Sequence, residues 1–154
     1  VLKRAAAHEG TAFVEIFQNC IVFNDGAYDA ITDKGVRDDA RLLLEHGKPL
    51  VFGKNKDKGI RLRGLEPEVV TLGENGVSAA DLVVHDEAAE HGGLAFFLSQ
   101  FDAPKFPVPL GVFRAVSQPS YEVMNERLHA DARQRRGRGD LAALFNSGDT
   151  WTIK

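Results

Sequence analysis

The stretch TAFVEIFQNCIVFNDG, residues 11–26, constrains the chain most, because it places the only cysteine directly after a predicted strand. Residues 11–17 are rich in β-branched and aromatic side chains, which predicts a buried strand. Cys20 follows, and three apolar residues later comes the turn-forming triplet Asn24-Asp25-Gly26. In open α/β sheets, ligands bind at the carboxyl ends of strands. Cys20 is therefore a candidate ligand or nucleophile, although a free cysteine is more often a small core residue.

The composition is typical of a globular protein without a membrane-spanning segment. The chain has 154 residues, a net charge of −3 and 44% hydrophobic residues, which predicts one globular domain or slightly more. Its apolar runs are too short to span a bilayer, and no apolar segment follows the first charged residues as in a signal peptide. A single cysteine excludes an internal disulfide. We expect a cytoplasmic protein without a membrane or nucleic-acid partner.

The first residues predict that other elements precede them in the fold. Residues 1–10 resemble the second half of a helix that ends at Gly10, and the predicted strand follows at once. A helix that leads into a buried strand is the later part of a βαβ unit, which needs a parallel strand upstream. We therefore expect a preceding N-terminal portion.

The rest of the chain alternates strand and helix signals, which predicts an α/β fold. Residues 48–71 predict a small β-meander, because three short apolar runs are separated by turn formers. The other expected elements are a weak helix over 36–45, strands over 82–85 and 110–116, and helices over 88–101, 120–136 and 140–145. The helix over 88–101 carries an apolar stripe of Leu94, Phe97, Leu98 and Phe101.

Two histidine-containing segments are candidate sites. The segment His85–His91 gathers two histidines and three acids, but it matches neither HExxH nor HxxEH. This pattern favours a capped helix start over a metal site. His46 lies on a predicted turn, where a structural role is more common than a functional one.

The chain also contains two runs of basic residues. One comprises Lys54, Lys56, Lys58, Arg61 and Arg63, and the other comprises Arg133, Arg135, Arg136 and Arg138. The pattern favours solvated surfaces, and the alternative is a docking surface for an acidic protein. No aromatic residue lies within the second run, which argues against nucleic-acid stacking.

Several segments along the chain together carry a family resemblance. They are GTAFVEIFQNCIVFNDGAYD, LEHGKPLVFG, KGIRL, EVVTLGENG, LVVHDE, PVPLGVFRAV and the terminal GDTW. On these segments, from Gly10 to Trp151, the chain resembles the carboxyl-terminal half of the β subunit of 2-oxoacid:ferredoxin oxidoreductases, closest to the 2-oxoglutarate type. The resemblance implies an oxidoreductase with thiamine diphosphate, Mg²⁺ and a four-iron four-sulfur cluster. It also implies decarboxylation of a 2-oxoacid, transfer of the acyl group to coenzyme A, and transfer of electrons to ferredoxin.

The resemblance further implies a place in the fold and a set of partners. Residues 1–47 would end a doubly wound domain that binds thiamine diphosphate, and residues 48–154 would form the β-subunit carboxyl-terminal domain with the meander and the last helices. The partners would be an α subunit, in a heterotetramer, and ferredoxin. The open alternative is a non-catalytic domain for subunit assembly.

Site residues follow from the same resemblance. Cys20 matches the last cluster cysteine of the family, and Asn24, Asp25 and Gly26 match the cofactor-facing loop after it. No catalytic residue is assigned. The family's CxxC pair and its GDG…N segment are absent from this chain. We therefore expect these 154 residues alone to bind neither the cluster nor thiamine diphosphate tightly.

Overall fold

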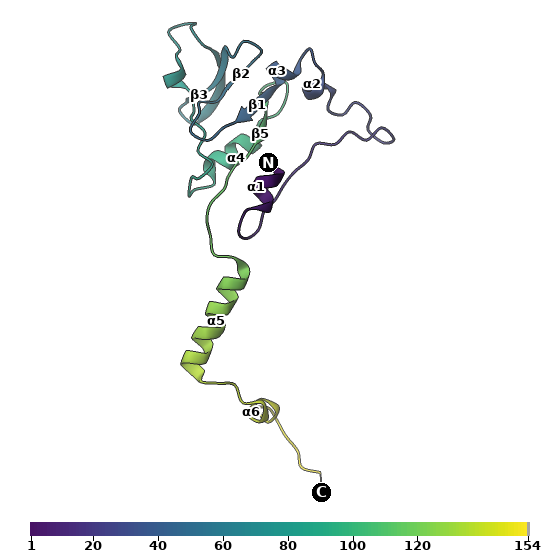
Figure 1. Cartoon of the computed structure of the whole chain (residues 1–154), viewed down its shortest axis with the longest axis vertical. Coiled ribbons are helices and arrows are strands. Elements are labelled where there is room, and N and C mark those ends of the chain that lie inside the picture. Colours follow the sequence, from purple (N-terminus) through teal and green to yellow (C-terminus); the bar gives the residue numbers. More distant parts are fainter. Residues whose placement is uncertain (154) are drawn as a thin grey trace. The chain divides into compact units, whose positions relative to one another are not determined.

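A computed structural model describes residues 1–153, which fall into two compact units (Figure 1). The first unit comprises residues 1–6 and 13–116. The second comprises residues 7–12 and the chain from residue 117 onward. Each unit is described by itself. No helix within residues 1–153 combines the length and the apolar character that crossing a membrane requires.

The first unit mixes short helices with two small sheets. In chain order its elements are α1 (Leu2–Ala6), α2 (Asp29–Thr32), α3 (Arg37–Ala40), β1 (Arg41–Leu44), β2 (Val51–Phe52), β3 (Lys58–Arg63), β4 (Glu66–Thr71), the 3₁₀ turn η1 (Ala79–Asp81), α4 (Gly93–Ser99) and β5 (Val108–Gly111). The mixed α/β class is confirmed. The larger doubly wound domain stays a prediction.

The three-stranded sheet is the predicted meander. Its strands lie in the order β2-β3-β4 and are antiparallel, with Ile60 opposite Val69. Gly59 on β3 lies against Leu82, and an added Cβ at Gly59 would overlap a Leu82 methyl carbon. The bare backbone at Gly59 therefore lets the chain after η1 cover this sheet. The meander prediction over residues 48–71 is confirmed.

The two-stranded sheet pairs segments that are distant in the sequence. Strands β1 and β5 run parallel, with Leu42 opposite Pro109 and Leu44 opposite Gly111. Leu42 and Leu44 are buried whereas Leu43 is 67% exposed, as expected when alternate side chains face opposite sides of a strand. The helix predicted over 36–45 is therefore wrong beyond Ala40, because pairing with β5 outweighs a weak helical preference.

One apolar core holds β1, β2, β3 and α4 together. It comprises Leu42, Leu44, Leu50, Phe52, Ile60, Leu98 and Phe101, with Leu94, Phe97 and Phe106 packed against it. The predicted stripe on the helix is thus confirmed, although α4 is shorter than the predicted range. The rings of Phe97, Phe101 and Phe106 form a continuous aromatic contact, with centroid separations of 5.0 and 4.6 Å.

Two predicted strands are wrong. Residues 11–17 have no strand structure, and Phe13 and Ile16 are 90% and 67% exposed. A strand needs a neighbour for its N–H and C=O groups, and no segment of residues 1–153 pairs with this stretch. Residues 82–85 make only isolated bridges, between Pro49 and Val84 and between Arg61 and Leu82. The first helix also ends at Ala6, four residues before the predicted Gly10.

The second unit contains α5 (Tyr121–Arg136) and α6 (Leu141–Phe145). Ser120 caps α5 by accepting a hydrogen bond from the Val123 N–H, and Asp140 caps α6 in the same way from Ala142. Gly137 follows α5 with a φ of 76°, a backbone conformation that glycine adopts readily because it has no Cβ. Both predicted helices are confirmed. Neither contains a buried residue.

Candidate functional site

Cys20 begins a tight turn rather than ending a strand. The Asn24 N–H donates to the Cys20 carbonyl oxygen over 2.9 Å, and these two residues form an isolated antiparallel bridge. The three apolar residues between them project outward, with Phe23 90% exposed. The Cys20 side chain is exposed as well. The prediction of a strand end is therefore wrong, and so is the alternative that Cys20 is a core residue.

Backbone amides around the turn favour the thiolate form of Cys20. Hydrogen bonding from the Phe23 amide, and then from the Val22 amide, lowers the pKa of the Cys20 thiol below its usual value. The thiolate is the form of cysteine that binds metals and attacks electrophiles. The turn thus presents an accessible sulfur atom with increased thiolate character.

Asn19 closes the loop that contains Cys20. Its Oδ1 accepts a hydrogen bond from the Gly26 N–H over 3.1 Å, and its Nδ2 donates to Oδ1 of Asp25 over 2.9 Å. Gly26 has a φ of 74°, and an added Cβ there would lie 2.8 Å from the Asp29 carboxylate. Asn24, Asp25 and Gly26 therefore share one closed loop with Cys20. Sequence reasoning missed Asn19, although an asparagine before a turn is a recognised signal for such bonds.

The donor set limits what this loop can hold. Within residues 1–153 no three histidine, cysteine or acidic residues gather closely enough to bind a metal ion. Cys20 fits as one thiolate of a four-cysteine iron–sulfur cluster, because it is exposed and its pKa is lowered. Asn24 and Asp25 do not form a Mg²⁺ site by themselves. Any complete cofactor site needs residues from outside this part of the chain.

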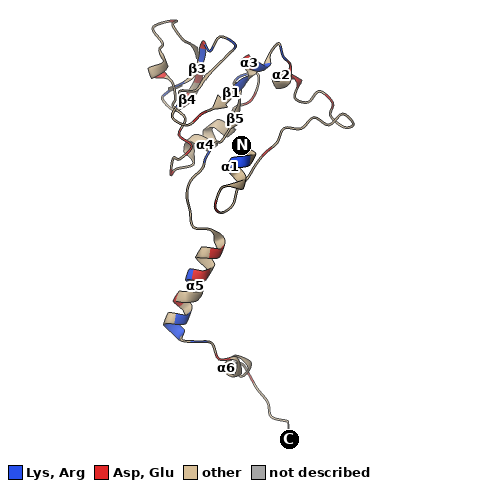
Figure 2. Ribbon diagram, in the orientation of Figure 1, with Lys and Arg blue, Asp and Glu red and all other residues tan. Residues whose placement is uncertain are grey.

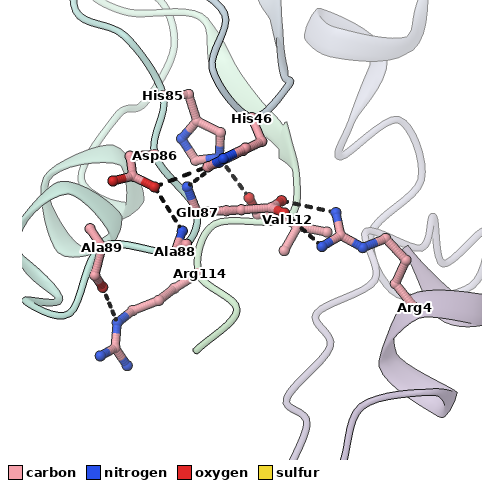
Figure 3. A network of polar contacts seen from close by, with 9 residues as sticks. All are labelled: Arg4, His46, His85, Asp86, Glu87, Ala88, Ala89, Val112 and Arg114. Atoms are coloured by element: carbon pink, nitrogen blue, oxygen red, sulfur yellow. Dashed lines mark hydrogen bonds and ion pairs between the residues drawn. The ribbon is translucent and has the colours of Figure 1, made fainter. Parts of the chain in front are cut away.

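His85 is a structural residue in a polar network (Figure 3). It is fully buried, and its Nε2 lies 2.8 Å from the Val112 carbonyl oxygen at the end of β5. His91 is exposed, and residues 85–91 form no helix. The predicted helix start over residues 85–91 is therefore wrong, and the buried His85 does not form a metal site with the exposed His91. His46 accepts a hydrogen bond from the Glu87 N–H over 3.3 Å, which is a structural contact.

Two arginines fix the same segment from distant parts of the chain. Arg4 binds both carboxylate oxygens of Glu87, over 2.7 and 2.9 Å (Figure 3). These hydrogen bonds lower the pKa of the Glu87 carboxyl. Arg114 donates to the carbonyl oxygens of Ala89 and Glu90, over 3.2 and 2.6 Å. This network positions α1 and the chain after β5, and it leaves the loop around Cys20 as the candidate site.

Comparison with known proteins identifies a relative. The chain is 34% identical over 156 residues to the 2-oxoglutarate oxidoreductase subunit KorB of Mycobacterium tuberculosis (strain ATCC 25618 / H37Rv). The resemblance inferred from the sequence is confirmed. The match includes 99% of this chain, which spans 41% of the length of KorB. No protein-family model matches the chain. No solved structure matches it either.

Proposed function

We propose that this chain is part of the β subunit of a 2-oxoacid oxidoreductase, in which Cys20 supplies one thiolate ligand to a four-iron four-sulfur cluster. The observation that supports this role is the exposed Cys20 thiol, whose pKa is lowered by the amides of its own turn. The similarity to KorB along nearly the whole chain supports the same enzyme class. A four-iron four-sulfur cluster is held by four cysteines, so three more would come from elsewhere in the subunit.

In the proposed enzyme, thiamine diphosphate supplies the decarboxylation chemistry and the cluster accepts single electrons. The residues of this chain would bind the cluster and adjust its reduction potential. The Val22 and Phe23 amides stabilise negative charge on the Cys20 sulfur, and hydrogen bonds of this kind raise the reduction potential of a cluster. Asn19 holds the loop closed, so that the sulfur keeps its direction relative to the other ligands.

Asn24, Asp25 and Gly26 are proposed to face the thiamine diphosphate and Mg²⁺ region. Gly26 allows a close backbone approach, and its carbonyl oxygen accepts the N–H of Asp29 at the start of α2. Residues outside this chain would hold the diphosphate and the metal ion directly, because Asn24 and Asp25 do not form a metal site. In the full-length subunit, residue 47 would mark the end of the cofactor-binding domain.

The proposed substrate is 2-oxoglutarate, following the name of the relative KorB. The acyl group would pass to coenzyme A and the electrons to ferredoxin, in a cytoplasmic heterotetramer with an α subunit. Ferredoxin docking is proposed at the β2–β3 hairpin. There Lys58 and Arg61 are neutralised by Asp39 and Glu68, over 2.8 and 2.5 Å. Lys54, Lys56 and Arg63 form no ion pair within residues 1–153 and would make the contact.

The experiment that tests this function uses the complete complex. The full-length β subunit containing this stretch is co-expressed with its α subunit, and reduction of viologen is measured with 2-oxoglutarate, pyruvate and branched-chain 2-oxoacids. Reduction that depends on coenzyme A and is fastest with 2-oxoglutarate supports the proposal. A complex that contains cofactor but reduces viologen with none of these oxoacids overturns it.

A second candidate function is subunit assembly without catalysis. The second unit favours it, because α5 and α6 contain no buried residue and expose large apolar side chains. The coding sequence upstream discriminates the two functions. CxxC and GDG…N motifs there support the enzyme, and their absence supports the assembly domain.

A further inference from the structure

The loop between β2 and β3 presents basic side chains on a fixed backbone. Lys54 and Lys56 are exposed on it, whereas Gly53 at its start is buried. The Lys56 N–H donates to the Gly53 carbonyl oxygen over 3.0 Å, which closes a turn. Lys56 has a φ of 53°, a conformation uncommon for a lysine, so the surrounding contacts must hold it. Figure 2 shows basic residues in blue at β3 and in the loop beside it. We call residues 53–58 the lysine loop.

Helix α3 holds the lysine loop from one side. The Gly53 N–H donates to the Asp38 carbonyl oxygen over 3.0 Å. The Lys58 ammonium donates to Oδ1 of Asp39 over 2.8 Å. The hydrogen bond from Lys58, and to a smaller extent one from the Lys54 amide, lowers the pKa of the Asp39 carboxyl below its usual value. The carboxylate of Asp39 therefore contacts the lysine loop near both of its ends.

Gly53 and Asp57 complete the attachment of the lysine loop. Gly53 has a φ of 93°, and an added Cβ there would lie 3.4 Å from Oδ1 of Asp39 and 3.0 Å from Oδ1 of Asp57. The absence of a side chain at Gly53 therefore lets both carboxylates lie against its backbone. The Asp57 carbonyl oxygen accepts the Leu72 N–H over 2.7 Å, which joins the other side of the loop to the residue after β4.

The ion pair between Lys58 and Asp39 contributes little to the stability of the fold. The two side chains are 40% and 47% exposed, and water screens the attraction between charges this exposed. A fixed loop has a different consequence. Charged side chains on a loop that is already held in one conformation lose less entropy when they bind a partner. The contacts of Asp39 therefore favour binding by the lysine loop more than they favour folding.

The segment that contains Asp39 also leads back to Cys20. The chain runs from the loop around Cys20 through α2 and α3 into β1 (Figure 1). Nε of Arg41 donates to the Ile31 carbonyl oxygen, which fastens α2 to the start of β1. Asp39 thus lies on the segment that joins Cys20 to the first unit's sheets, and it contacts the lysine loop directly. The lysine loop is separate from residues 24–26, which are proposed to face the cofactors.

We propose that Asp39 is a positioning residue for the docking of an acidic electron-carrier protein. Asp39 holds the lysine loop so that Lys54 and Lys56 meet the carboxylates of that partner in one fixed geometry. This inference rests on the proposed function, in which ferredoxin accepts the electrons.

Positioning and simple charge attraction predict effects of opposite sign at Asp39. Removing its negative charge makes the surface more basic, which by itself strengthens the attraction to an acidic protein. Releasing the lysine loop weakens docking instead, because Lys54 and Lys56 then lose more entropy when they bind. A substitution at Asp39 therefore separates the two explanations.

Steady-state kinetics of the complete complex test the proposal. The full-length β subunit is co-expressed with its α subunit, and the KM for ferredoxin is measured for Asp39→Ala, Asp39→Asn and Asp38→Ala. Each rate is divided by the viologen reduction rate of the same preparation, which corrects for inactive complex. All of these substitutions remove one negative charge from α3, so the differences between them report the geometry of the lysine loop.

Asp39→Ala should raise the KM for ferredoxin about three- to tenfold with little change in kcat, because the lysine loop loses its acceptor. Asp39→Asn should stay within about twofold of the unaltered complex, because its amide oxygen still accepts hydrogen bonds. Asp38→Ala should give an equal or lower KM, since the carbonyl oxygen that binds Gly53 remains. In K54A/K56A, which lacks the docking lysines, Asp39→Ala should add no further rise.

Hydrogen exchange provides a readout that does not depend on activity. The amides of residues 53–58 should exchange faster in the Asp39→Ala complex than in the unaltered complex, and Asp38→Ala should leave their exchange unchanged. Equal exchange in the Asp39→Ala complex and the unaltered complex overturns the positioning role.

Failure of this inference is distinguishable from failure of the proposed function. An unaltered complex that reduces viologen with no 2-oxoacid, or that reduces viologen but not ferredoxin, overturns the proposed function and this inference with it. If the unaltered complex reduces both, a KM for Asp39→Ala equal to or below that for Asp38→Ala overturns the positioning role alone. Charge attraction would then be sufficient to explain docking.

Discussion

Asn19 and Gly26 close the loop that presents Cys20, through a 3.1 Å hydrogen bond from the Gly26 N–H to the Asn19 side-chain oxygen. The same asparagine donates to Asp25, so one side chain binds the far end of the turn twice. The thiol therefore lies in a fixed turn and not in a loose loop. Its chemistry depends on that geometry, because the groups that stabilise the thiolate are backbone amides of the turn.

Cys20 should react with alkylating agents at a lower pH than an unfolded cysteine. The lowered pKa means that the thiolate is present at pH values where a free peptide thiol is still protonated. Iodoacetamide modification followed against pH, in buffer and in urea, measures the difference. Asn19→Ala should move the native profile towards the denatured one, because the turn loses its closure. If the native and denatured chains gave the same profile, the turn would not lower the pKa of Cys20.

Gly26→Ala should destabilise the chain by about 1–2 kcal/mol, because a residue with a Cβ is strained at a positive φ. The added carbon would also approach the Asp29 carboxylate within 2.8 Å. Urea unfolding measures the change. Gly35→Ala is the matched control, since Gly35 has no positive φ and no atom within 4 Å of an added Cβ. Equal effects of the two substitutions would show that Gly26 is not conformationally required.

The ion pair between Arg4 and Glu87 should make stability depend on pH. Arg4 lowers the pKa of Glu87 in the folded state below its ordinary value of 4.5. The stabilisation is therefore fully present above pH 4.5 and is lost as the pH falls through the lower, folded-state pKa. At neutral pH, Arg4→Met should lower the free energy of unfolding only slightly, because water screens an ion pair whose arginine is more than half exposed.

Urea unfolding of the unaltered chain and of Arg4→Met over a range of pH provides the measurement. The difference between the two should shrink to nothing at strongly acidic pH, where Glu87 is protonated. Lys3→Met is the matched control, since Lys3 lies in α1 without an ion pair to any of residues 1–153. A difference that does not vary with pH would exclude the carboxylate as its source.

His85→Ala should destabilise the first unit by about 2–3 kcal/mol. The substitution leaves a cavity at a fully buried position and removes the partner of the Val112 carbonyl oxygen. Thermal unfolding compared with His91→Ala, at an exposed position of the same segment, measures the effect. If both variants unfold at the same temperature, the buried histidine does not tie β5 to the segment after η1.

Turn-forming and helix-starting residues were enough to predict the meander and α5, because both depend on interactions between residues close in the sequence. The meander follows from turn formers such as Gly53, and α5 follows from Pro119 at its start. The strand predicted over residues 11–17 was wrong because its apolar residues indicate burial, but a strand also needs a neighbour for its backbone. No other segment of residues 1–153 provides one.

Contacts between distant residues were not predictable from local pattern. β1 pairs with β5 across more than sixty residues of chain, and its leucine run suits a helix as well as a strand. Arg4 and Glu87 are 83 residues apart, so neither charge indicates the other. In the candidate site, Cys20 was singled out from a predicted strand end, which was wrong, and from the family resemblance. The amides that lower its pKa became visible only with the backbone of that turn.

The central claim is that the Cys20 sulfur is a cluster ligand, and the iron content of the complete complex tests it most directly. The full-length β subunit with Cys20→Ala, co-purified with the α subunit, is compared with the unaltered complex and with Ile21→Ala, which changes an exposed neighbour. Iron is assayed chemically, and the reduced cluster is followed by electron paramagnetic resonance. Loss of the cluster signal in Cys20→Ala, with the signal retained in Ile21→Ala, is the predicted result. A Cys20→Ala complex with full iron content and an unchanged cluster spectrum would contradict the account.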